Sequence, residues 1–181
     1  MDWRIERHET VGSTMEIAAV HAACGAPAGL VVVAEEQTMG RGRLGRVWLA
    51  PPGTSLLVTA LFRPALAAMN SGKLSRQIAR EVGAAVTEVT GVQPSVKAPN
   101  DLLIEGKKIA GILCQSSIRG DRFDHLLVGI GLNVNIPPDQ LPFPTATSLL
   151  SVTGVPHDRE QLLAAILARL ARFPELSGAR G

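Results

Sequence analysis

Residues 102–113 read Leu-Leu-Ile-Glu-Gly-Lys-Lys-Ile-Ala-Gly-Ile-Leu. Two apolar runs flank Glu105-Gly106-Lys107, a pattern typical of a β-hairpin with a short turn. A second hairpin follows, because the chain turns again at Arg119-Gly120-Asp121 and continues into the apolar run 126–132. Consecutive hairpins pair their strands antiparallel. This stretch therefore predicts a sheet that is mainly antiparallel.

Helical patterns lie on both sides of these hairpins. Capping-box sequences, in which a polar side chain accepts from the first turn and a glutamate reaches back, predict helices that begin at Ser13 and near Asp158. An apolar stripe at spacings of three and four predicts a helix over about residues 72–90. Apolar runs at 29–36 and 56–62 predict further strands. The predicted fold class is α/β (α+β), with a mixed, mostly antiparallel sheet flanked by helices.

The composition suits one globular domain. The chain has 181 residues, of which 46% are hydrophobic and 19% charged, and these values exclude a disordered, highly charged chain. Lys and Arg exceed Asp and Glu by only 18 to 16, so we expect no nucleic-acid partner. Two cysteines without metal-ligand spacing, an N-terminus without a signal segment and no apolar run of ~18 residues predict a reduced, cytoplasmic protein that binds no membrane.

Residues 40–46 read Gly-Arg-Gly-Arg-Leu-Gly-Arg and lie between two predicted strands. Arginine presents a fixed fork of donors that suits carboxylate and phosphate, and glycine lets the backbone approach a ligand closely. The loop alone supports small-molecule anion binding no more strongly than its alternatives, which are a solvated basic turn or a contact with RNA.

A second candidate segment is Lys97 with Pro99-Asn100-Asp101, followed across the hairpin by Lys108. An amide and a carboxylate on a Pro-fixed turn can serve phosphate and Mg²⁺, although an ordinary turn explains this segment better when it is taken alone. Lys108 begins an apolar strand, where an ammonium group is costly unless it is paired or points into a polar cleft. Ala110-Gly111 leave space beside it.

The third candidate segment is Gly129–Asn135, which reads Gly-Ile-Gly-Leu-Asn-Val-Asn. Two glycines in a strand mark either the close approach of a ligand or a bulged strand end. The four histidines are scattered, and Cys114 reads as a small buried residue rather than a nucleophile. The sequence thus favours a site that positions and stabilises an anion over covalent catalysis.

In this order and spacing, the segments resemble the catalytic domain of biotin protein ligases, in the biotin/lipoate protein ligase family. The matching pieces are Gly12-Ser13-Thr14, Glu36-Gln37, Gly40–Arg46 with Trp48, Lys97 with Pro99-Asn100-Asp101, Gly106–Leu113 and Gly129–Asn135. The resemblance implies the catalytic fold shared with class II aminoacyl-tRNA synthetases. It also implies a catalytic domain over residues 1–173, and we expect residues 174–181, at the chain terminus, to be a frayed tail.

The resemblance implies a ligase that uses ATP and Mg²⁺ to convert biotin into biotinyl-5′-AMP. A lysine of a biotin carboxyl carrier domain then takes the biotinyl group, and a homodimer is compatible with the family. Two alternatives stay open. One is a lipoate or octanoate ligase or transferase of the same fold, and the other is a non-catalytic module that binds biotin or RNA.

The resemblance also implies roles for individual residues. Arg43 and Lys108 would be catalytic. The biotin-binding residues would be Ser13, Thr14, Gln37, Gly40, Arg41, Gly42, Arg43, Lys108, Gly111 and Gly129. The side of the site that serves ATP and metal would be formed by Arg46, Trp48, Lys97, Asn100, Asp101 and Asn133. Mg²⁺ would arrive with ATP and not be held by the protein alone.

Several features depart from the family pattern. Ala98 stands where the family usually has Trp, and Met15 stands where it usually has Asn. We expect no N-terminal helix-turn-helix for DNA binding, and we expect the usual C-terminal β-barrel domain to be absent.

Overall fold

A computed structural model describes residues 1–64, 71–119, 122–173 and 176. Within these residues one seven-stranded sheet has the order β1-β2-β3-β7-β6-β5-β4. Its strands are β1 (Arg4–Val11), β2 (Leu30–Gln37), β3 (Ser55–Phe62), β4 (Ser95–Lys97), β5 (Asp101–Ile104), β6 (Lys107–Arg119) and β7 (Arg122–Asn133). The β1–β2 pair is parallel and every other pair is antiparallel. The predicted mixed, mostly antiparallel sheet is confirmed.

The hairpin at residues 102–113 forms as predicted. Glu105 (φ 49°) and Gly106 (φ 78°) both adopt the left-handed conformation that a two-residue turn between antiparallel strands requires. Strand β6 then pairs with β7 along most of its length. The predicted turn between β6 and β7 falls on Gly120 and Asp121, which lie outside the described residues.

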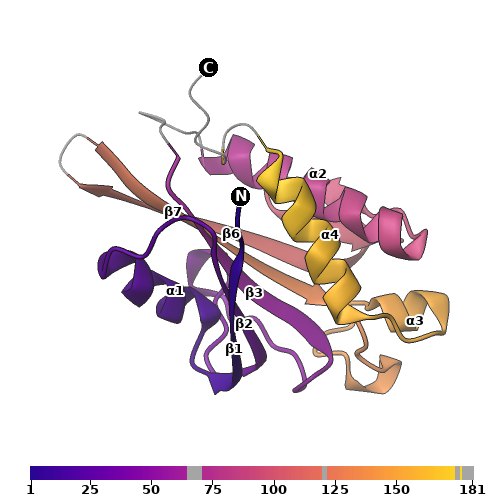
Figure 1. The fold of residues 1–181 in the computed structure, drawn as a ribbon. Coiled ribbons are helices and arrows are strands. Elements are labelled where there is room, and N and C mark those ends of the chain that lie inside the picture. Colours follow the sequence, from indigo (N-terminus) through magenta and orange to yellow (C-terminus); the bar gives the residue numbers. More distant parts are fainter. Residues whose placement is uncertain (65–70, 120–121, 174–175, 177–181) are drawn as a thin grey trace.

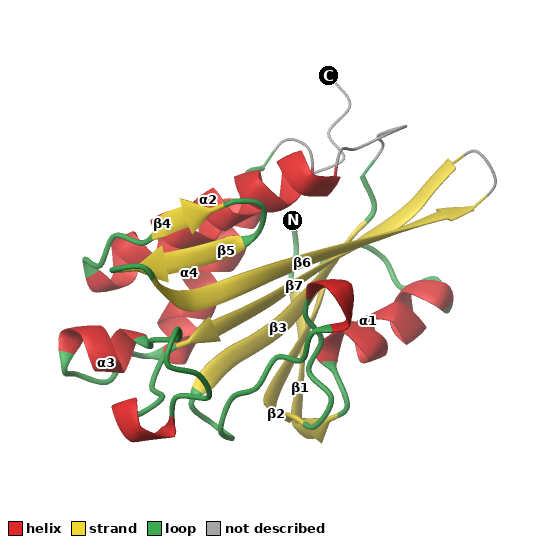
Figure 2. Cartoon of the chain, turned by 180° about the vertical axis from the view of Figure 1, so that it is seen from behind, coloured by secondary structure: helices red, strands yellow, loops and turns green. Residues whose placement is uncertain are grey.

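Four α-helices are described: α1 (Thr14–Ala23), α2 (Ser71–Thr90), α3 (Leu149–Thr153) and α4 (Arg159–Ala171). Figures 1 and 2 show α2 and α4 together on one side of the sheet and α1 on the other. Ser13 and Asp158 cap α1 and α4 as predicted, each accepting from backbone N–H groups of the first turn. Within the described residues the longest helices are not apolar enough to cross a bilayer.

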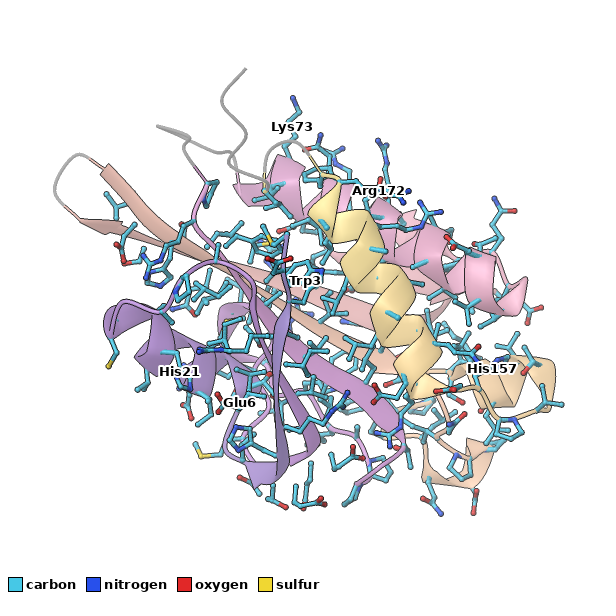
Figure 3. The ribbon with its side chains drawn as sticks, viewed as in Figure 1. Trp3, Glu6, His21, Lys73, His157 and Arg172 are labelled. Atoms are coloured by element: carbon cyan, nitrogen blue, oxygen red, sulfur yellow. The ribbon has the colours of Figure 1, made fainter. Side chains whose placement is uncertain are left out.

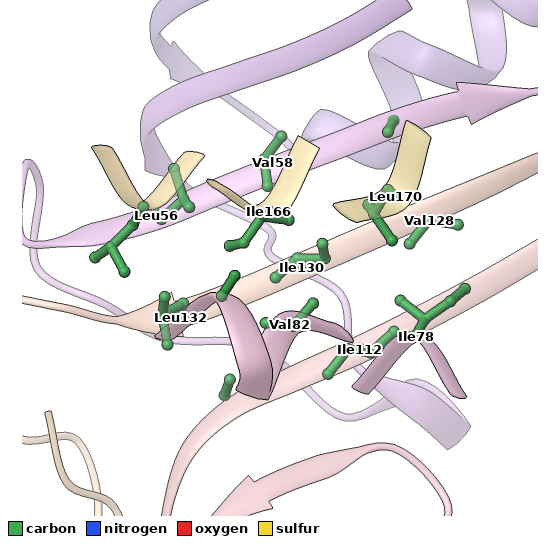
Figure 4. Close-up of a cluster of buried hydrophobic side chains, with 14 of the residues drawn as sticks. Leu56, Val58, Ile78, Val82, Ile112, Val128, Ile130, Leu132, Ile166 and Leu170 are labelled. Carbon is green, nitrogen blue, oxygen red and sulfur yellow. The ribbon is translucent and has the colours of Figure 1, made fainter. Parts of the chain in front are cut away.

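The larger core lies between the sheet and the pair α2 and α4. Strand residues point alternately to the two faces. Figure 4 shows the strand residues Val58, Ile112 and Ile130 packed against Val82 of α2 and Ile166 of α4. A smaller core on the opposite face packs α1 against β2, β3 and β7. The cavity described below opens on this second face, beside the first turn of α1.

The structure adds two elements that the sequence patterns did not predict. Strand β1 is mostly exposed and carries charges in place of an apolar alternation, so it has no strand signature. Glu6 on β1 lies 2.7 Å from His8 Nε2 and 3.0 Å from His21 Nε2 of α1, which joins the edge strand to that helix (Figure 3). Helix α3 is only five residues long. Of the predicted tail, residues 174, 175 and 177–181 lie outside the described residues, and Leu176 is buried.

Candidate active site

A cavity of about 370 Å³ opens on the face of the sheet that carries α1. The first turn of α1, residues 41–49, strands β3, β6 and β7, and the segment 142–146 enclose it. Thirteen of the predicted site residues line it together: Ser13, Thr14, Gln37, Arg41, Gly42, Arg43, Arg46, Trp48, Asn100, Lys108, Gly111, Gly129 and Asn133. Three do not belong to the lining. Gly40 is buried beside Trp48, Asp101 pairs with Lys108, and Lys97 is exposed on the edge strand β4.

One end of the cavity is neutral and could hydrogen-bond an uncharged ring, so we call it the ring end. It is formed by Ser13, Thr14, Gln37 and Thr59. The amide oxygen of Gln37 accepts from both the backbone N–H of Thr14 (2.8 Å) and its hydroxyl (3.0 Å). The Thr14 and Thr59 hydroxyl oxygens are 2.9 Å apart. Ser13 accepts from Met15 N and thereby caps α1. These contacts hold uncharged hydrogen-bonding groups rigidly on α1, β2 and β3.

Met15 forms part of the floor beside this end. Its side chain is buried, and its Cε atom lies 2.7 Å from the place that a Cβ on Gly129 would occupy. A side chain at residue 129 would therefore displace Met15 from the floor. Met15 thus gives the cavity a flexible thioether wall beside the ring end.

The other end of the cavity is cationic, and we call it the charged end: Arg41, Arg43, Arg46 and Lys108. Its arginines lie on a small closed loop, in which Gly42 N donates to Arg46 O (2.7 Å) and an isolated antiparallel bridge joins Arg41 to Val47. Glu16, in the first turn of α1, pairs with Arg41 instead of reaching back to Ser13 as the capping box predicts.

Arg43 and Arg46 also have partners within the protein. Arg43 Nη1 donates to Asn100 Oδ1 (3.4 Å), and Asn100 in turn donates from Nδ2 to Ile112 O (2.8 Å). Arg46 Nε donates to Arg43 O (3.2 Å). Each of the three guanidinium groups therefore already has a partner within the protein.

Lys108 enters the cavity from the start of β6. Its Nζ lies 2.7 Å from Asp101 Oδ1 and 5.5 Å from the centroid of the Trp48 ring. Of the two alternatives expected for this lysine, pairing is observed, and Lys108 also lines the cavity. Backbone bonds from Lys108 N to Thr145 O and from Thr147 N to Lys108 O, each 2.8 Å, attach the segment 142–146 beside it.

Glycines make room for Trp48 over the sheet. A Cβ on Gly131 would lie 2.5 Å from a Trp48 ring atom, and one on Gly111 would lie 3.1 Å from the ring and 3.3 Å from Lys108 Nζ. The space beside Lys108 that the sequence predicts for a ligand is thus partly taken by the indole. Trp48 Nε1 is buried and has no hydrogen-bond partner in the described part of the chain.

The part of the cavity that the structure describes offers amide and carboxylate oxygens that could contact a metal ion, but no cluster of acidic, histidine or cysteine ligands. No group of three or more His, Cys, Asp or Glu side chains within the described residues could hold a metal ion. The oxygen donors at the charged end are Asn100, Asp101 and Asn133. Asn133 lines the cavity, and among the described residues its buried Oδ1 atom has no hydrogen-bond partner.

Sequence reasoning missed several residues of this cavity. Thr59 lies inside a run of apolar residues and belongs to no motif that would have marked it as a site residue. Pro142, Phe143 and Ala146 belong to a Pro-rich connection, and the backbone pairing with Lys108 that brings them to the cavity is a contact between distant segments. Gly131 and Met15 stood within or next to the quoted motifs but had no assigned role.

Comparison with known proteins decides the family. The sequence profile described as the biotin/lipoate A/B protein ligase family matches residues 9–133, which is more than half of the chain. The chain belongs to this family. It is 37% identical over 163 residues to the bifunctional ligase/repressor BirA of Bacillus subtilis, and the match covers 88% of this chain and 50% of that protein. It is 34% identical over 164 residues to a biotin–[acetyl-CoA-carboxylase] ligase of Mycobacterium tuberculosis, with 88% and 59% covered.

Solved structures agree with this family assignment. The biotin protein ligase of Aquifex aeolicus in complex with biotin and ATP superposes with a TM-score of 0.77 at 34% identity, over 92% of this chain and 68% of that one. The ligase of Leishmania major in complex with biotinyl-5-AMP gives a TM-score of 0.75 at 29% identity, over 92% and 72%. The predicted fold class is therefore confirmed. The chain spans about half the length of the first two curated relatives that it matches.

Proposed function

We propose that this chain catalyses the ATP-dependent activation of biotin as biotinyl-5′-AMP and the transfer of the biotinyl group to a lysine of a biotin carboxyl carrier domain. One observation carries the proposal. A single cavity joins a neutral end, able to hydrogen-bond an uncharged ring, to an end where Arg41, Arg43 and Lys108 meet. Biotin has the same division, with a ureido ring at one end and a carboxylate at the other.

The charged end suits the first step. A biotin carboxylate oxygen forms a bond to the α-phosphorus of ATP while the bond from that phosphorus to the bridging oxygen breaks, and pyrophosphate leaves with the electron pair. Negative charge builds up on the phosphoryl oxygens. Arg43 and Lys108 are fixed cations that stabilise this charge more than they stabilise the ground state. Bringing a carboxylate and a triphosphate together also requires cations to offset their repulsion.

The second step needs access for a protein amine. The lysine nitrogen attacks the carbonyl carbon of the mixed anhydride, AMP leaves with the electron pair, and the amide nitrogen loses a proton. Residues 41–47 lie at the cavity beside Lys108, so this loop is placed to shield the adenylate from water. Asn100, Asp101 and Asn133 would serve Mg·ATP, in which the ion neutralises phosphate charge.

The names of the relatives support biotin as the substrate and a carboxyl carrier domain as the acceptor. Several matched proteins are called biotin–[acetyl-CoA-carboxylase] ligase or biotin–protein ligase, and one structure is a complex with biotin and ATP. We extend these substrates to the present chain, with a carrier domain as acceptor and a cytoplasmic location. A homodimer stays a prediction.

The alternative of an acyl transferase with a cysteine nucleophile has little support. Burial raises the pKa of the Cys114 thiol to about 11, and Cys114 is absent from the residues that line the cavity. The thiol is therefore protonated at neutral pH, and the nucleophilic thiolate is scarce. Cys24 is exposed and lies at the far end of α1.

Pyrophosphate exchange into ATP separates the candidates. We expect exchange with the full 181-residue chain when biotin is added, and only background exchange with lipoate or without an acid. Exchange that depends on lipoate would support the lipoate ligase instead. Biotin binding by calorimetry without any exchange would identify a non-catalytic binding module and contradict the proposal.

A further inference from the structure

Thr59 is a buried hydroxyl in the middle of an apolar strand. It is 0% exposed and lies on β3 between Val32 of β2 and Gly129 of β7. A buried hydroxyl costs free energy unless it is hydrogen-bonded, and a valine would fill the same space without that cost. The residue touches the cavity wall and contacts the Thr14 hydroxyl. This placement suggests a role in the site.

The hydrogen bonds at the ring end can run in one direction only. The backbone N–H of Thr14 is a donor, so the atom it meets on Gln37 must be the amide oxygen. That oxygen can only accept, and therefore the Thr14 hydroxyl must donate its single proton to it. The 2.9 Å contact between the two threonine hydroxyls must then be a donation from Thr59 to Thr14. The chain runs from Thr59 through Thr14 to Gln37.

This direction fixes what the ring end offers a ligand. The Gln37 amide is oriented with Oε1 toward Thr14, so Nε2 is its free side, and within the described residues Nε2 donates to no other group. The Thr14 hydroxyl donates its proton to Gln37 and has only lone pairs left for a ligand, whereas Thr59 is fully buried and meets no ligand directly. A donor beside acceptors complements a group in which a carbonyl lies next to N–H groups, as in a cyclic urea, and does not complement a dithiolane or an alkyl chain.

We propose that Thr59 is a positioning residue for the ring-binding end, which acts through Thr14 to hold Gln37 in its donor orientation. This inference rests on the proposed function, because it names the part of biotin that the ring end recognises. Thr59 has no exposed surface, so it influences the ligand through its neighbours. Loss of its hydroxyl removes the only donor among the described residues that reaches the Thr14 oxygen, and the Thr14 hydroxyl is then oriented by its bond to Gln37 alone.

The test compares Thr59→Val, which has nearly the same shape, with Thr59→Ser, which keeps the hydroxyl. We expect Thr59→Val to raise the Kd and KM for biotin about tenfold, the factor expected for one hydrogen bond. The KM for ATP and the kcat at saturating biotin should stay within about twofold. Thr59→Ser should restore the wild-type KM for biotin. Ser55→Ala is the matched control, because it removes a buried hydroxyl of the same strand that lies outside the cavity.

Two outcomes would overturn the inference: an unchanged biotin KM in folded Thr59→Val, or an equal loss in Thr59→Val and Thr59→Ser. If Thr59→Val does not fold, as judged by thermal unfolding, the pair Thr59→Ala and Thr59→Ser gives the same comparison, and equal KM values in that pair would overturn it. Wild-type protein is measured first in every series. Absence of biotin-dependent exchange there is a failure of the proposed function, whereas normal wild-type exchange with unaffected variants is a failure of the role of Thr59 alone.

Discussion

The two ends of the cavity are built differently. At the ring end, a one-way chain of neutral hydrogen bonds is buried between α1 and the central strands and is complete without a ligand. At the charged end, each cation is held by a protein group, as Lys108 is by Asp101 and Arg41 by Glu16. On the proposed function, the ring end would be set for binding in advance, whereas the charged end would exchange its internal partners for substrate anions.

We therefore expect the rate of the adenylation step to depend most on the charged end. We expect Lys108→Ala and Arg43→Ala each to lower biotin-dependent pyrophosphate exchange at least tenfold at saturating substrates, because each removes a cation from the developing phosphoryl charge. Lys107→Ala is the control, since Lys107 is exposed and does not line this cavity. Wild-type exchange rates in either alanine variant would show that the charged end has been assigned wrongly.

Glycine substitutions test how the two ends are separated. In Gly131→Ala the new Cβ would lie 2.5 Å from the Trp48 ring, which is rigid and packed beside Lys108. In Gly129→Ala the new Cβ meets the flexible end of Met15 at 2.7 Å. We expect Gly131→Ala to cost about 1–3 kcal/mol in the free energy of unfolding and to lower kcat, as measured by urea unfolding and exchange.

Gly129→Ala should mainly raise the KM for biotin, by a smaller factor, because a methionine can move aside. Met15→Ala in the same chain is expected to relieve that increase by removing the clashing group. An effect of Gly129→Ala on kcat larger than that of Gly131→Ala would contradict the division between the two ends.

The smallest effect is expected at Glu16. Glu16→Gln removes the negative charge that Arg41 must leave when a substrate carboxylate arrives. Because both side chains are partly exposed, the ion pair stabilises this arrangement of Arg41 by only about 0.2–1 kcal/mol. We expect the KM for biotin to fall by up to about threefold at low salt, and the difference from wild type to shrink at high salt. Glu9→Gln, at an exposed carboxylate of β1, is the matched control, and an equal shift there would remove the specific role of Glu16.

Local sequence patterns predicted the elements that depend on local interactions. The turn at Glu105-Gly106 and the caps Ser13 and Asp158 satisfy requirements within a few residues, and each forms as expected. The demand that Lys108 have a partner followed from the cost of a buried ammonium group, although the sequence did not name Asp101 as that partner. The arginine loop and Lys108 could therefore be identified from the sequence, because charged side chains in such positions require a partner or a ligand.

The remaining parts depend on contacts between distant segments. Thr59 becomes informative only when β3 is placed beside Thr14, which lies 45 residues away in sequence. Strand β1 is an edge strand that is held by parallel pairing with β2. Because it is mostly exposed and carries charged residues, its sequence shows no alternation of apolar and polar residues. The indole of Trp48 lies over Gly111 and Gly131 because the arginine loop folds back onto the sheet. None of these placements has a local sequence signature.

The most direct test of the division between the two ends is the rate of biotin-dependent pyrophosphate exchange at saturating biotin in Lys108→Ala and Thr59→Val, measured side by side. We expect the exchange rate of Lys108→Ala to stay at least tenfold below wild type however much biotin is added. Thr59→Val should reach a rate within about twofold of wild type once biotin saturates it. An equal fall in the saturated exchange rate of both variants would contradict the different roles of the two ends.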